Sequence, residues 1–421
     1  MLFGLIISLT GFSAQERSAL GGLRWWKGNL HTHSLWSDGD DYPEMIAEWY
    51  KQHGYHFLAF SDHNILLQDE RWMVITGQRA EQTFQKYLQR FGPRWVEQVT
   101  LQSTQVVRLK PLSEFRSLFE APDRFLMIPS EEISDQYKKI PIHINATNLR
   151  DLIPPQGGTN VLDVMQRNVN AVLAQRQKTG QPLLPHLNHP NFGWAITAED
   201  LMQLRGENFF EVYNGHPSIH NDGDVHHAST ERMWDIILTF RLTSLKLGPM
   251  YALAVDDSHH YHALSRTNSN SGRGWIMVRA PRLEAAAIIT AMEAGDFYAC
   301  TGVRLKEVTR GPTQLSLVID PEPGVTYITK FFGTRKGYDP ASEPVEGPTN
   351  SVAAVTRHYS SEIGTLLGAG NGTLASYVLQ GDEIYVRAKV ISSKPKANSV
   401  VPDETEMAWT QPLVPPVPAT K

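Results

Sequence analysis

The sequence contains almost no cysteine, no excess of positive charge and no long apolar segment. Cys300 is the only cysteine, which excludes a disulfide framework and a zinc site built from thiolates. Lysine and arginine total 39 against 44 acidic residues, a net charge of −5, so the chain has no overall basic field that would attract nucleic acid. We therefore expect no nucleic-acid partner.

The apolar stretch MLFGLIISLTGFSAQ at the start of the chain is too short to span a membrane. It resembles the apolar part of a secretory signal with cleavage after Ala14, although no basic residue precedes it and Phe12 fits the cleavage pattern poorly. We expect residues 1–23 to be a signal or N-terminal segment, the protein to be exported to the periplasm or beyond the cell, and no stable membrane insertion. A cytoplasmic protein with a frayed N-terminus is the alternative.

A serine nucleophile elbow and a glycine-rich phosphate loop are also missing, which argues against a covalent serine route and against ATP use. Histidine, by contrast, is abundant, with 16 residues in the chain. Histidine and carboxylate ligands without cysteine suit Zn, Mn or Fe better than Ca or Mg.

Short apolar runs alternate with helical patterns over about residues 24–301, which predicts an α/β domain with a parallel sheet, open or closed into a barrel. Proline and an acidic residue in a first turn predict a helix from Pro43 that stops at Gly54. Amphipathic spacing predicts further helices over 161–178, from Ser229, and over 283–294.

The pattern changes twice along the chain. The alternation breaks over about 66–122, where residues 71–91 look helical. We expect a helical insertion that covers another part of the molecule; a plain surface excursion is the alternative. After residue 304, β-favouring stretches are separated by glycine and proline. We divide the chain into an α/β domain over 24–305, a small β-sandwich-like domain over 306–411 and a proline-rich tail over 412–421.

Histidines and acidic residues stand at the ends of at least six predicted strands. In a parallel α/β architecture the carboxyl ends of the strands meet on one face, where sites are built. Residues i and i+2 of a strand point to the same side, so His31 and His33 can reach one ion together. Further residues of this kind are Asp62, His63, Glu131, Glu132, His143, His186, His189, Glu211, Asn214, Asp256, Asp257 and His259. Together they predict a metal site.

The pattern resembles the PHP (polymerase and histidinol phosphatase) family of metal-dependent hydrolases. Four signatures carry the resemblance: His31-x-His33-x4-Asp38, Asp62-His63, Glu132 within PSEEIS, and Asp257-Ser258-His259. His143 and Asn188-His189-Pro190 follow in the order that the family requires, and the resemblance covers about residues 24–305. It implies a distorted (β/α)7 barrel with two or three divalent ions in a cleft at the carboxyl ends of the strands.

The resemblance also implies which residues hold the ions, which would be Zn, Mn or Fe. The first ion would be bound by His31, His33, Glu132 and Asp257. A second would share Glu132 with His143 and His189, and a third would take Asp38, His63 and His259. His186 competes with His189 for its place, and His189 is favoured because it lies in the Asn-His-Pro match. Glu131 is the weaker alternative to Glu132.

Several polar residues are expected around the ions. Asp62 and Asp256 would orient ligand imidazoles. Arg266 and Arg273, just after the last metal motif, are candidates for binding a substrate phosphate. Three cations of the insertion are further candidates: Arg108, Lys110 and Arg116. Four histidines after Glu211 are expected to form a solvated loop rather than to line the pocket: His216, His220, His226 and His227.

The expected function is hydrolysis by a metal-bridging hydroxide. The catalytic centre would comprise Asp38, Glu132, His189, Asp257 and His259. A two-ion clamp suits displacement at phosphorus, which favours a phosphoesterase that acts on a small molecule. The signal-like start, the insertion and the β domain are similar to the exported carbaryl-hydrolase-type branch, so a hydrolase of carbamates, carboxylic esters or amides is the first alternative. A 3′–5′ exonuclease and a non-catalytic metal-dependent binding protein are the others, and the oligomeric state stays open.

Overall fold

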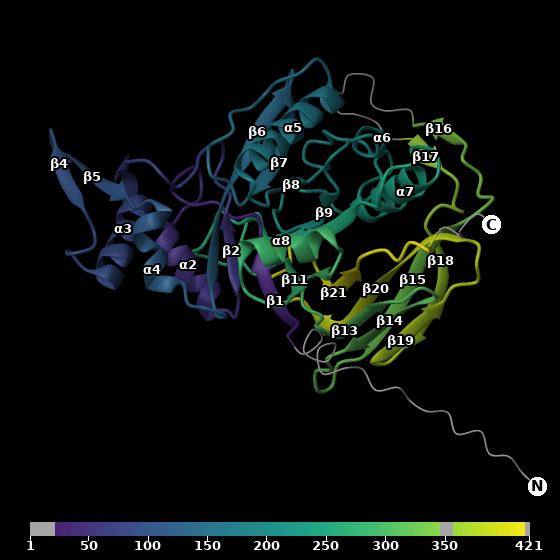
Figure 1. The fold of residues 1–421 in the computed structure, drawn as a ribbon. Helices are drawn as coiled ribbons and strands as arrows, with labels where there is room; N and C mark the ends of the chain where they lie inside the picture. The colour runs from purple at the N-terminus through teal and green to yellow at the C-terminus, as the bar shows by residue number, and fades with distance from the viewer. Residues whose placement is uncertain (1–21, 346–356, 417–421) are drawn as a thin grey trace, which may run out of the picture.

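The computed structural model describes residues 22–345 and 357–416. It shows a mixed α/β, two-domain protein in which one large sheet runs from the α/β part into the C-terminal β part (Figure 1). The expected signal sequence and the last residues of the tail lie outside the described residues. None of the described helices is long and apolar enough to span a membrane.

Seven strands form the sheet of the α/β part: β1 (Arg24–Asn29), β2 (Phe57–Phe60), β6 (Leu126–Tyr137), β7 (Ile140–Thr147), β8 (Leu184–Leu187), β9 (Phe209–Asn214) and β10 (Tyr251–Val255). They lie in the order β10-β9-β8-β7-β6-β2-β1. The pairs β1–β2, β2–β6, β8–β9 and β9–β10 are parallel. The pairs β6–β7 and β7–β8 are antiparallel, because β6 and β7 form a long hairpin that breaks the predicted strand–helix alternation.

The two edges of this seven-stranded sheet meet at one end. Just beyond β1 and β10, Thr32 and Ser258 form a parallel bridge, in which the His33 N–H donates to the Ser258 carbonyl (3.0 Å). The Asp257 N–H donates to the His31 carbonyl (3.1 Å). β10 is otherwise an edge strand of the hydrogen-bonded sheet, so the hydrogen bonds do not resolve a closed (β/α)7 barrel. They do bring the ends of the first and last strands together.

The helices that the sequence predicts in the α/β part are present. α2 (Pro43–Gln52) begins on its proline, which has no N–H to leave unpaired in the first turn. α5 (Val161–Thr179) is capped by Asn160, and it ends at Gly180, whose φ of 68° glycine adopts without steric cost. Further helices are α7 (Thr230–Leu242), which Ser229 caps, α8 (Ala285–Glu293), and α6 (Ala198–Leu201), which the sequence does not predict.

The insertion is less helical than predicted. It contains β3 (Arg71–Val74), α3 (Gly77–Phe91), β4 (Gln98–Leu101), β5 (Thr104–Leu109) and α4 (Leu112–Phe119), and its strands pair in the order β3-β5-β4. The prediction of a helix from Arg71 is therefore wrong for its first residues. Trp72 and Val74 favour an extended backbone, and Val74 pairs with Val106 across the small sheet.

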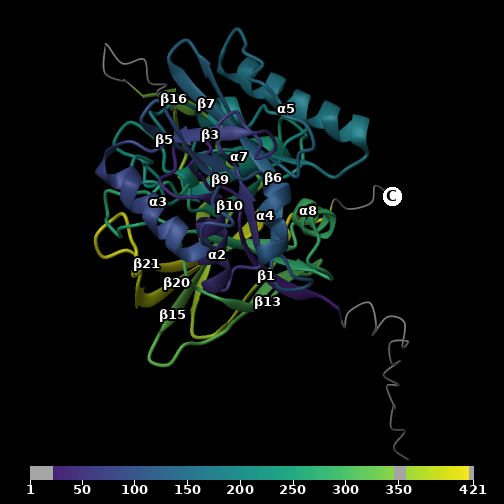
Figure 2. The same ribbon diagram turned by 90° about the vertical axis from the view of Figure 1, so that its left-hand side faces the viewer.

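The insertion packs against the loops that leave β1 and β10. Figure 2 views the molecule from this side, with α2, α3 and α4 in front of the sheet. The rings of Tyr42 and Tyr87 stack 3.9 Å apart, and Arg79 of α3 pairs with Asp40. The Thr83 hydroxyl lies 3.0 Å from Nε2 of His262. These contacts fix α3 next to the loop between β1 and α2.

The C-terminal part continues the sheet beyond β1. Its strands are β11 (Trp275–Ala280), β12 (Phe297–Cys300), β13 (Leu305–Arg310), β14 (Gln314–Ile319), β15 (Tyr327–Arg335), β16 (Ser342–Pro344), β17 (Arg357–Tyr359), β18 (Thr365–Asn371), β19 (Leu374–Val378), β20 (Glu383–Pro395) and β21 (Thr405–Thr410). The order β1-β11-β12-β21-β20-β15-β18 extends the large sheet, and β13-β14-β19 form a separate one. Apolar side chains of both sheets, such as Leu315 and Phe331, share one core, which is a sandwich-like arrangement.

A buried ion pair joins the two parts. Nε and a terminal nitrogen of Arg387 on β20 donate to the two carboxylate oxygens of Asp235 on α7 (2.8 and 2.7 Å). The guanidinium lies 4.7 Å from the ring centroid of Trp234 and 4.9 Å from that of Phe332. Because both charges are buried and matched, this contact fixes α7 against the β domain.

Candidate metal centre

Some of the residues predicted to bind metal lie just past the end of a strand, and others lie within a strand. His31 and His33 lie just past the end of β1, and Asp257 lies just past β10, so the bridge between these ends brings the three together. Glu132 and His143, by contrast, lie within the β6–β7 hairpin and not beyond a strand end. The prediction that the strand stops before Glu131 is therefore wrong, because β6 continues through both glutamates to pair with β7.

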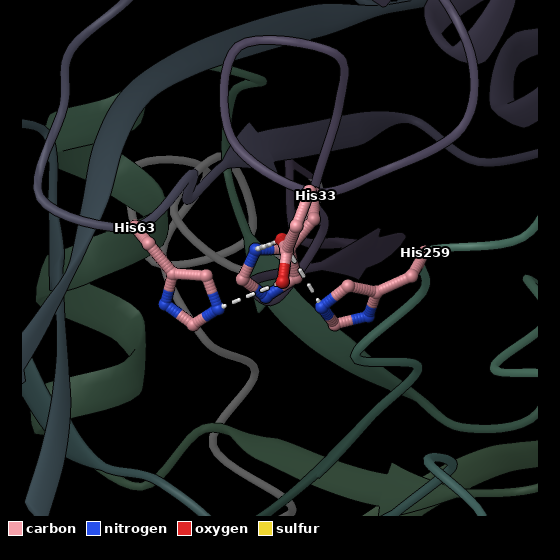
Figure 3. Close-up of side chains that lie close together, drawn as sticks. His33, His63 and His259 are labelled. Carbon is pink, nitrogen blue, oxygen red and sulfur yellow. Dashed lines mark ion pairs between the residues drawn. The ribbon is translucent and has the colours of Figure 1, made fainter. Parts of the chain in front are cut away.

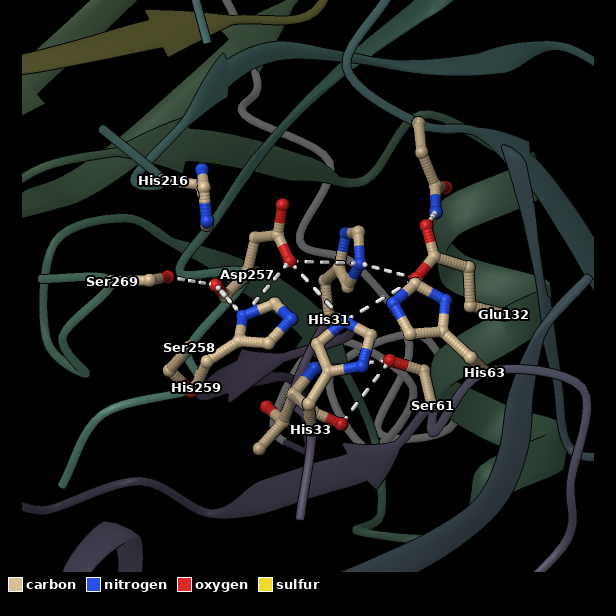
Figure 4. Close-up of polar contacts among 12 residues, drawn as sticks. His31, His33, Ser61, His63, Glu132, His216, Asp257, Ser258, His259 and Ser269 are labelled. Carbon is tan, nitrogen blue, oxygen red and sulfur yellow. Dashed lines mark hydrogen bonds and ion pairs between the residues drawn. The ribbon is translucent and has the colours of Figure 1, made fainter. Parts of the chain in front are cut away.

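Four buried side chains converge at the centre of the cluster (Figure 4). Nε2 of His33 lies 3.3 Å from Oε2 of Glu132 and 3.2 Å from Oδ1 of Asp257. Nε2 of His31 lies 3.4 and 3.2 Å from the same two oxygens. Both imidazole Nε2 atoms and the Glu132 Oε2 lack a hydrogen-bond partner among the described residues. Buried polar atoms are rarely left unpaired, so this set fits a cation.

The carboxylate of Glu132 also faces a second group of imidazoles. Its Oε1 lies 3.0 Å from Nδ1 of His143 and 3.3 Å from Nε2 of His189. Its Oε2 lies 2.9 Å from Nδ1 of His63. With its two oxygens turned to different groups, Glu132 is placed to bridge two ions.

Asp38 forms a third group with His63 and His259. Figure 3 shows the rings of His63 and His259 on either side of His33. The carboxylate oxygens of Asp38 lie 3.4 Å from Nε2 of His259 and 3.5 Å from Nε2 of His63. The His33 ring stacks on His259 with centroids 4.0 Å apart, so it lies between this group and the central one. The Asp38 side chain is 55% exposed, whereas Glu132 and Asp257 are 1% and 6% exposed. The cluster therefore opens to solvent at Asp38.

The electrostatics hold the two central carboxylates and His33 in the forms that bind metal. Burial alone would raise the pKa of Glu132, but the surrounding imidazoles, His63 foremost, hold that pKa well below its usual range. The imidazoles likewise hold the pKa of Asp257 low, with His31 the strongest. Burial and the neighbouring His259 lower the pKa of His33 to about 3. Ionised carboxylates beside a neutral imidazole are the protonation states that a divalent ion requires. For His31, burial lowers the pKa, but Asp257, Glu211 and Glu132 raise it well above its usual range, so this imidazole would lose a proton when it binds an ion.

Two solved structures are similar to this chain. One, from Bacteroides vulgatus, is described as a two-domain protein containing a predicted PHP-like metal-dependent phosphoesterase; it is 14% identical, covers 93% of this chain and 96% of its own, and gives a TM-score of 0.39. The other, from Bifidobacterium adolescentis, is described as a candidate metal-dependent phosphoesterase and is 12% identical, covering 55% of this chain and 87% of its own with a TM-score of 0.29. Such low scores do not by themselves assign an activity. No family model and no curated protein matches the sequence.

Among the described residues, Asp62 and Asp256 accept hydrogen bonds from backbone N–H groups and hydroxyls rather than from imidazoles. Asp62 accepts hydrogen bonds from the Ser34 N–H (2.8 Å) and the Ser37 hydroxyl (2.7 Å), so it shapes the loop that carries Asp38. Asp256 accepts from the N–H groups of Gly272, Arg273 and Gly274 and from the Tyr50 hydroxyl. The expectation that these carboxylates orient ligand imidazoles is thus not what their hydrogen bonds show.

Among the described residues, no hydrogen bond or ion pair joins the side chains of the predicted phosphate-binding arginines to the cluster. Arg273 is fully buried, and each of its guanidinium nitrogens donates to oxygens of neighbouring loops, among them the carbonyls of Gly215 (2.8 Å) and Ser265 (2.8 Å). It therefore has no N–H left to face a substrate. Arg266 is exposed on the same loop. The insertion's three cations pair with acidic neighbours: Arg108 and Lys110 with Glu97 and Glu114, and Arg116 with Glu120.

The histidine-rich loop after β9 is only partly the solvated loop that the sequence predicts. His216 lies beside the cluster, 5.4 Å from the His259 ring, so the prediction is wrong for this residue (Figure 4). His220 is exposed, and it stacks on Trp194 with centroids 4.5 Å apart. His227 also stacks on Trp194, at 4.0 Å.

One buried carboxylate in contact with the cluster was expected at a strand end but was assigned no role from the sequence. Glu211 of β9 is 0% exposed, and its Oε1 lies 2.6 Å from Nδ1 of His31. In the sequence it follows the apolar pair Phe209-Phe210, as Glu132 follows its own apolar run, and that position was the available signal. Glu131, which alternates to the other face of β6, accepts instead from the Ile153 N–H (2.8 Å).

Proposed function

We propose that this protein is a metal-dependent phosphoesterase of the PHP type, with two or three divalent ions at the cluster around Glu132. The observation that carries the proposal is the convergence of buried, unpartnered imidazole nitrogens on two carboxylates. The proposed barrel is the seven-stranded sheet from β1 to β10, whose edges meet at the Thr32–Ser258 bridge.

The three groups of side chains correspond to three candidate ion sites. The first is formed by His31, His33, Glu132 and Asp257, the second by Glu132, His143 and His189, and the third by Asp38, His63 and His259. His189 is preferred to His186 as a ligand, because its Nε2 faces Glu132 (3.3 Å) whereas the Nε2 of His186 faces Glu211 (3.3 Å). Imidazole and carboxylate donors without thiolates suit Zn, Mn or Fe.

Divalent ions bound at such a cluster supply hydroxide near neutral pH and neutralise charge on the oxygen of the substrate. The chain's own residues supply position and access. Glu132 and Asp257 would hold ions at the buried side of the cluster, and Asp38 faces solvent where a substrate would enter. His259, whose Nε2 lies 3.4 Å from Asp38, is on the same open side and would help to hold the outer ion where a substrate enters.

A small-molecule substrate is favoured over a nucleic acid. The net charge of −5 gives no overall attraction to a polyanion. The resemblance of the insertion and the β domain to the carbaryl-hydrolase-type branch makes a carbamate or carboxylic ester the alternative substrate. Both substrates would be cleaved at the same cluster, so only turnover separates them.

The test is a panel of three substrates offered to Mn2+- or Zn2+-loaded protein: p-nitrophenyl phosphate, bis-p-nitrophenyl phosphate and 1-naphthyl N-methylcarbamate. Turnover of either phosphoester, lost in Asp38→Ala, would support the phosphoesterase. Turnover of the carbamate alone would replace it with the ester hydrolase. Tight metal binding without turnover of any substrate would contradict both and leave a binding protein.

A further inference from the structure

Both carboxylate oxygens of Glu211 contact candidate metal ligands. Its Oε1 lies 2.6 Å from Nδ1 of His31 and 3.3 Å from Nε2 of His186. Its Oε2 accepts from the backbone N–H of His189 (2.8 Å) and from the side-chain amide of Asn214 (2.8 Å). The side chain is fully buried, so solvent does not weaken these contacts.

We infer that Glu211 is a positioning residue that orients His31 and ties it to His189 and Asp257 as one unit. The inference rests on the proposed metal-dependent function. Glu211 itself is not a ligand, because His31 Nδ1 is so close to Oε1 that the two atoms share a hydrogen bond and leave no room for an ion between them.

The contact decides which nitrogen of His31 is free. A neutral imidazole carries one proton, and when Nδ1 donates that proton to a carboxylate, Nε2 keeps its lone pair. Nε2 of His31 is the atom that faces Glu132 and Asp257, at 3.4 and 3.2 Å. A carboxylate that accepts from the far nitrogen also makes the ring a stronger ligand, and losing such a partner typically weakens metal binding.

The same carboxylate reaches two further candidate ligands. The backbone N–H of His189 donates to it directly, which fixes where the His189 side chain leaves the chain. The Asn214 amide nitrogen lies 2.8 Å from Oε2 of Glu211 and 3.0 Å from Oδ2 of Asp257, so it links the two carboxylates. Asp257 consequently keeps Oδ1 turned toward His31 and His33.

His186 has a supporting role in this arrangement. It is fully buried. Its Nε2 lies 3.3 Å from the same Glu211 oxygen that contacts His31, so His186 is placed as a second partner of that oxygen. The effect of Glu211 is confined to the inner side of the cluster, since none of its hydrogen bonds among the described residues reaches Asp38, His63 or His259.

The experiment compares Glu211→Gln, Glu211→Asp and wild type. Each protein is equilibrated against a series of buffered free Zn2+ concentrations, and the ions retained per chain are measured by elemental analysis. Glu211→Gln keeps the size of the side chain but removes its charge, so ions at the inner side should be lost at free Zn2+ concentrations about 10- to 100-fold higher than in wild type. Glu211→Asp keeps the charge and should restore part of the affinity.

Two control variants show whether the loss of Zn2+ is specific to Glu211. Glu207→Gln removes another fully buried carboxylate, which contacts the Phe209 N–H away from the cluster, and should retain Zn2+ as wild type does. Asp38→Ala should release the outer ion and leave the ions at the inner side in place. If Glu211 positions the inner ligands, Glu211→Gln should release the inner ions and keep the outer one, which is the reverse of Asp38→Ala.

The inference is overturned if Glu211→Gln retains Zn2+ within twofold of wild type, or if inner and outer ions are lost together. If Glu211→Gln does not fold, Asn214→Leu is measured in its place; it removes the hydrogen bonds from Asn214 to Glu211 and Asp257 but leaves the contact between Glu211 and His31, and it should weaken the inner ions alone. A wild-type protein that binds no divalent ion would refute the proposed function itself. If the wild type binds ions and hydrolyses a phosphoester while Glu211→Gln retains Zn2+ as the wild type does, only the role of Glu211 is refuted.

Discussion

Oε2 of Glu132 lies 3.3 Å from Nε2 of His33, although one residue is in the middle of a long strand and the other lies beyond the end of a short one. The β6–β7 hairpin extends past the ends of the parallel strands β1 and β2, so a side chain within it reaches the residues that follow β1. This relationship makes Glu132 the centre of the cluster, because its two oxygens face different groups of imidazoles.

The Asp38→Ala variant should lose hydrolysis without losing stability. Asp38 is the exposed side chain of the outer group, so we expect kcat/KM to fall by at least about 100-fold while the free energy of unfolding changes by less than about 0.5 kcal/mol. Steady-state kinetics of the metal-loaded protein and urea denaturation of the metal-free protein measure the two quantities. Asp69→Ala, which changes an exposed aspartate elsewhere, should alter neither. Equal losses of stability and activity in Asp38→Ala would contradict the assignment.

The Glu132→Gln variant should lose the stabilisation that metal gives to the wild type. Zn2+ at 100 times its Kd should raise the free energy of unfolding of the wild type by about 2.7 kcal/mol, since ions bind the folded state only. Removal of the bridging charge should abolish most of this increase. The measurement is chemical denaturation with and without Zn2+, and an undiminished increase in Glu132→Gln would show that Glu132 holds no ion.

The Glu207→Gln variant should become more stable than the wild type as the pH rises. Burial raises the pKa of Glu207 from its ordinary value of 4.5 to about 8, so the folded protein holds a proton that the unfolded chain releases. Stability is therefore lost as the pH rises from the unfolded pKa through the folded one, and glutamine is not subject to this loss. The stability gap between variant and wild type should grow by roughly 2–4 kcal/mol between about pH 5 and about pH 9. Denaturation at both pH values measures it, and a constant gap would contradict the prediction.

The Arg387→Met variant should weaken the junction between the two parts of the molecule. It leaves the buried Asp235 without its partner, at a cost of about 3–5 kcal/mol in guanidinium chloride unfolding. Adding Asp235→Leu should recover much of the loss, because the introduced methionine side chain would then lie among the rings of Trp234 and Phe332 without an unpaired charge beside it. As a comparison, Arg90→Ala breaks an exposed pair with Glu48 and should cost less than about 1 kcal/mol. A double variant no more stable than Arg387→Met would refute the pairing argument.

The sequence predicts the helices and the kinds of side chain in the cluster better than it predicts the geometry of the cluster. Helix α5 is foreseeable because Asn160 and Gly180 mark its ends locally. His31 and His33 are foreseeable as a pair because their spacing follows from strand geometry. The position of Glu132 within a hairpin is not foreseeable, because β6 continues through this residue only by pairing with β7, which follows after a turn.

Roles set by long-range contacts are also hidden from the sequence. Arg273 follows the last metal motif, which suggests a substrate contact, but its guanidinium donates to the carbonyls of Gly215 and Asn398, which lie on other loops. Glu211 stands after an apolar run like the predicted ligands, yet only the fold shows that its partners are His31 and His186. In both cases the neighbours that decide the role are distant in the chain.

The measurement that tests the central claim most directly is elemental analysis of the purified protein before and after chelation, with phosphoester hydrolysis assayed in each state. The account predicts two or three transition-metal ions per chain, loss of hydrolysis when they are removed, and recovery when Mn2+ or Zn2+ is returned. Fewer than one tightly held ion per chain after metal is supplied, or full hydrolysis after all metal is removed, would contradict it.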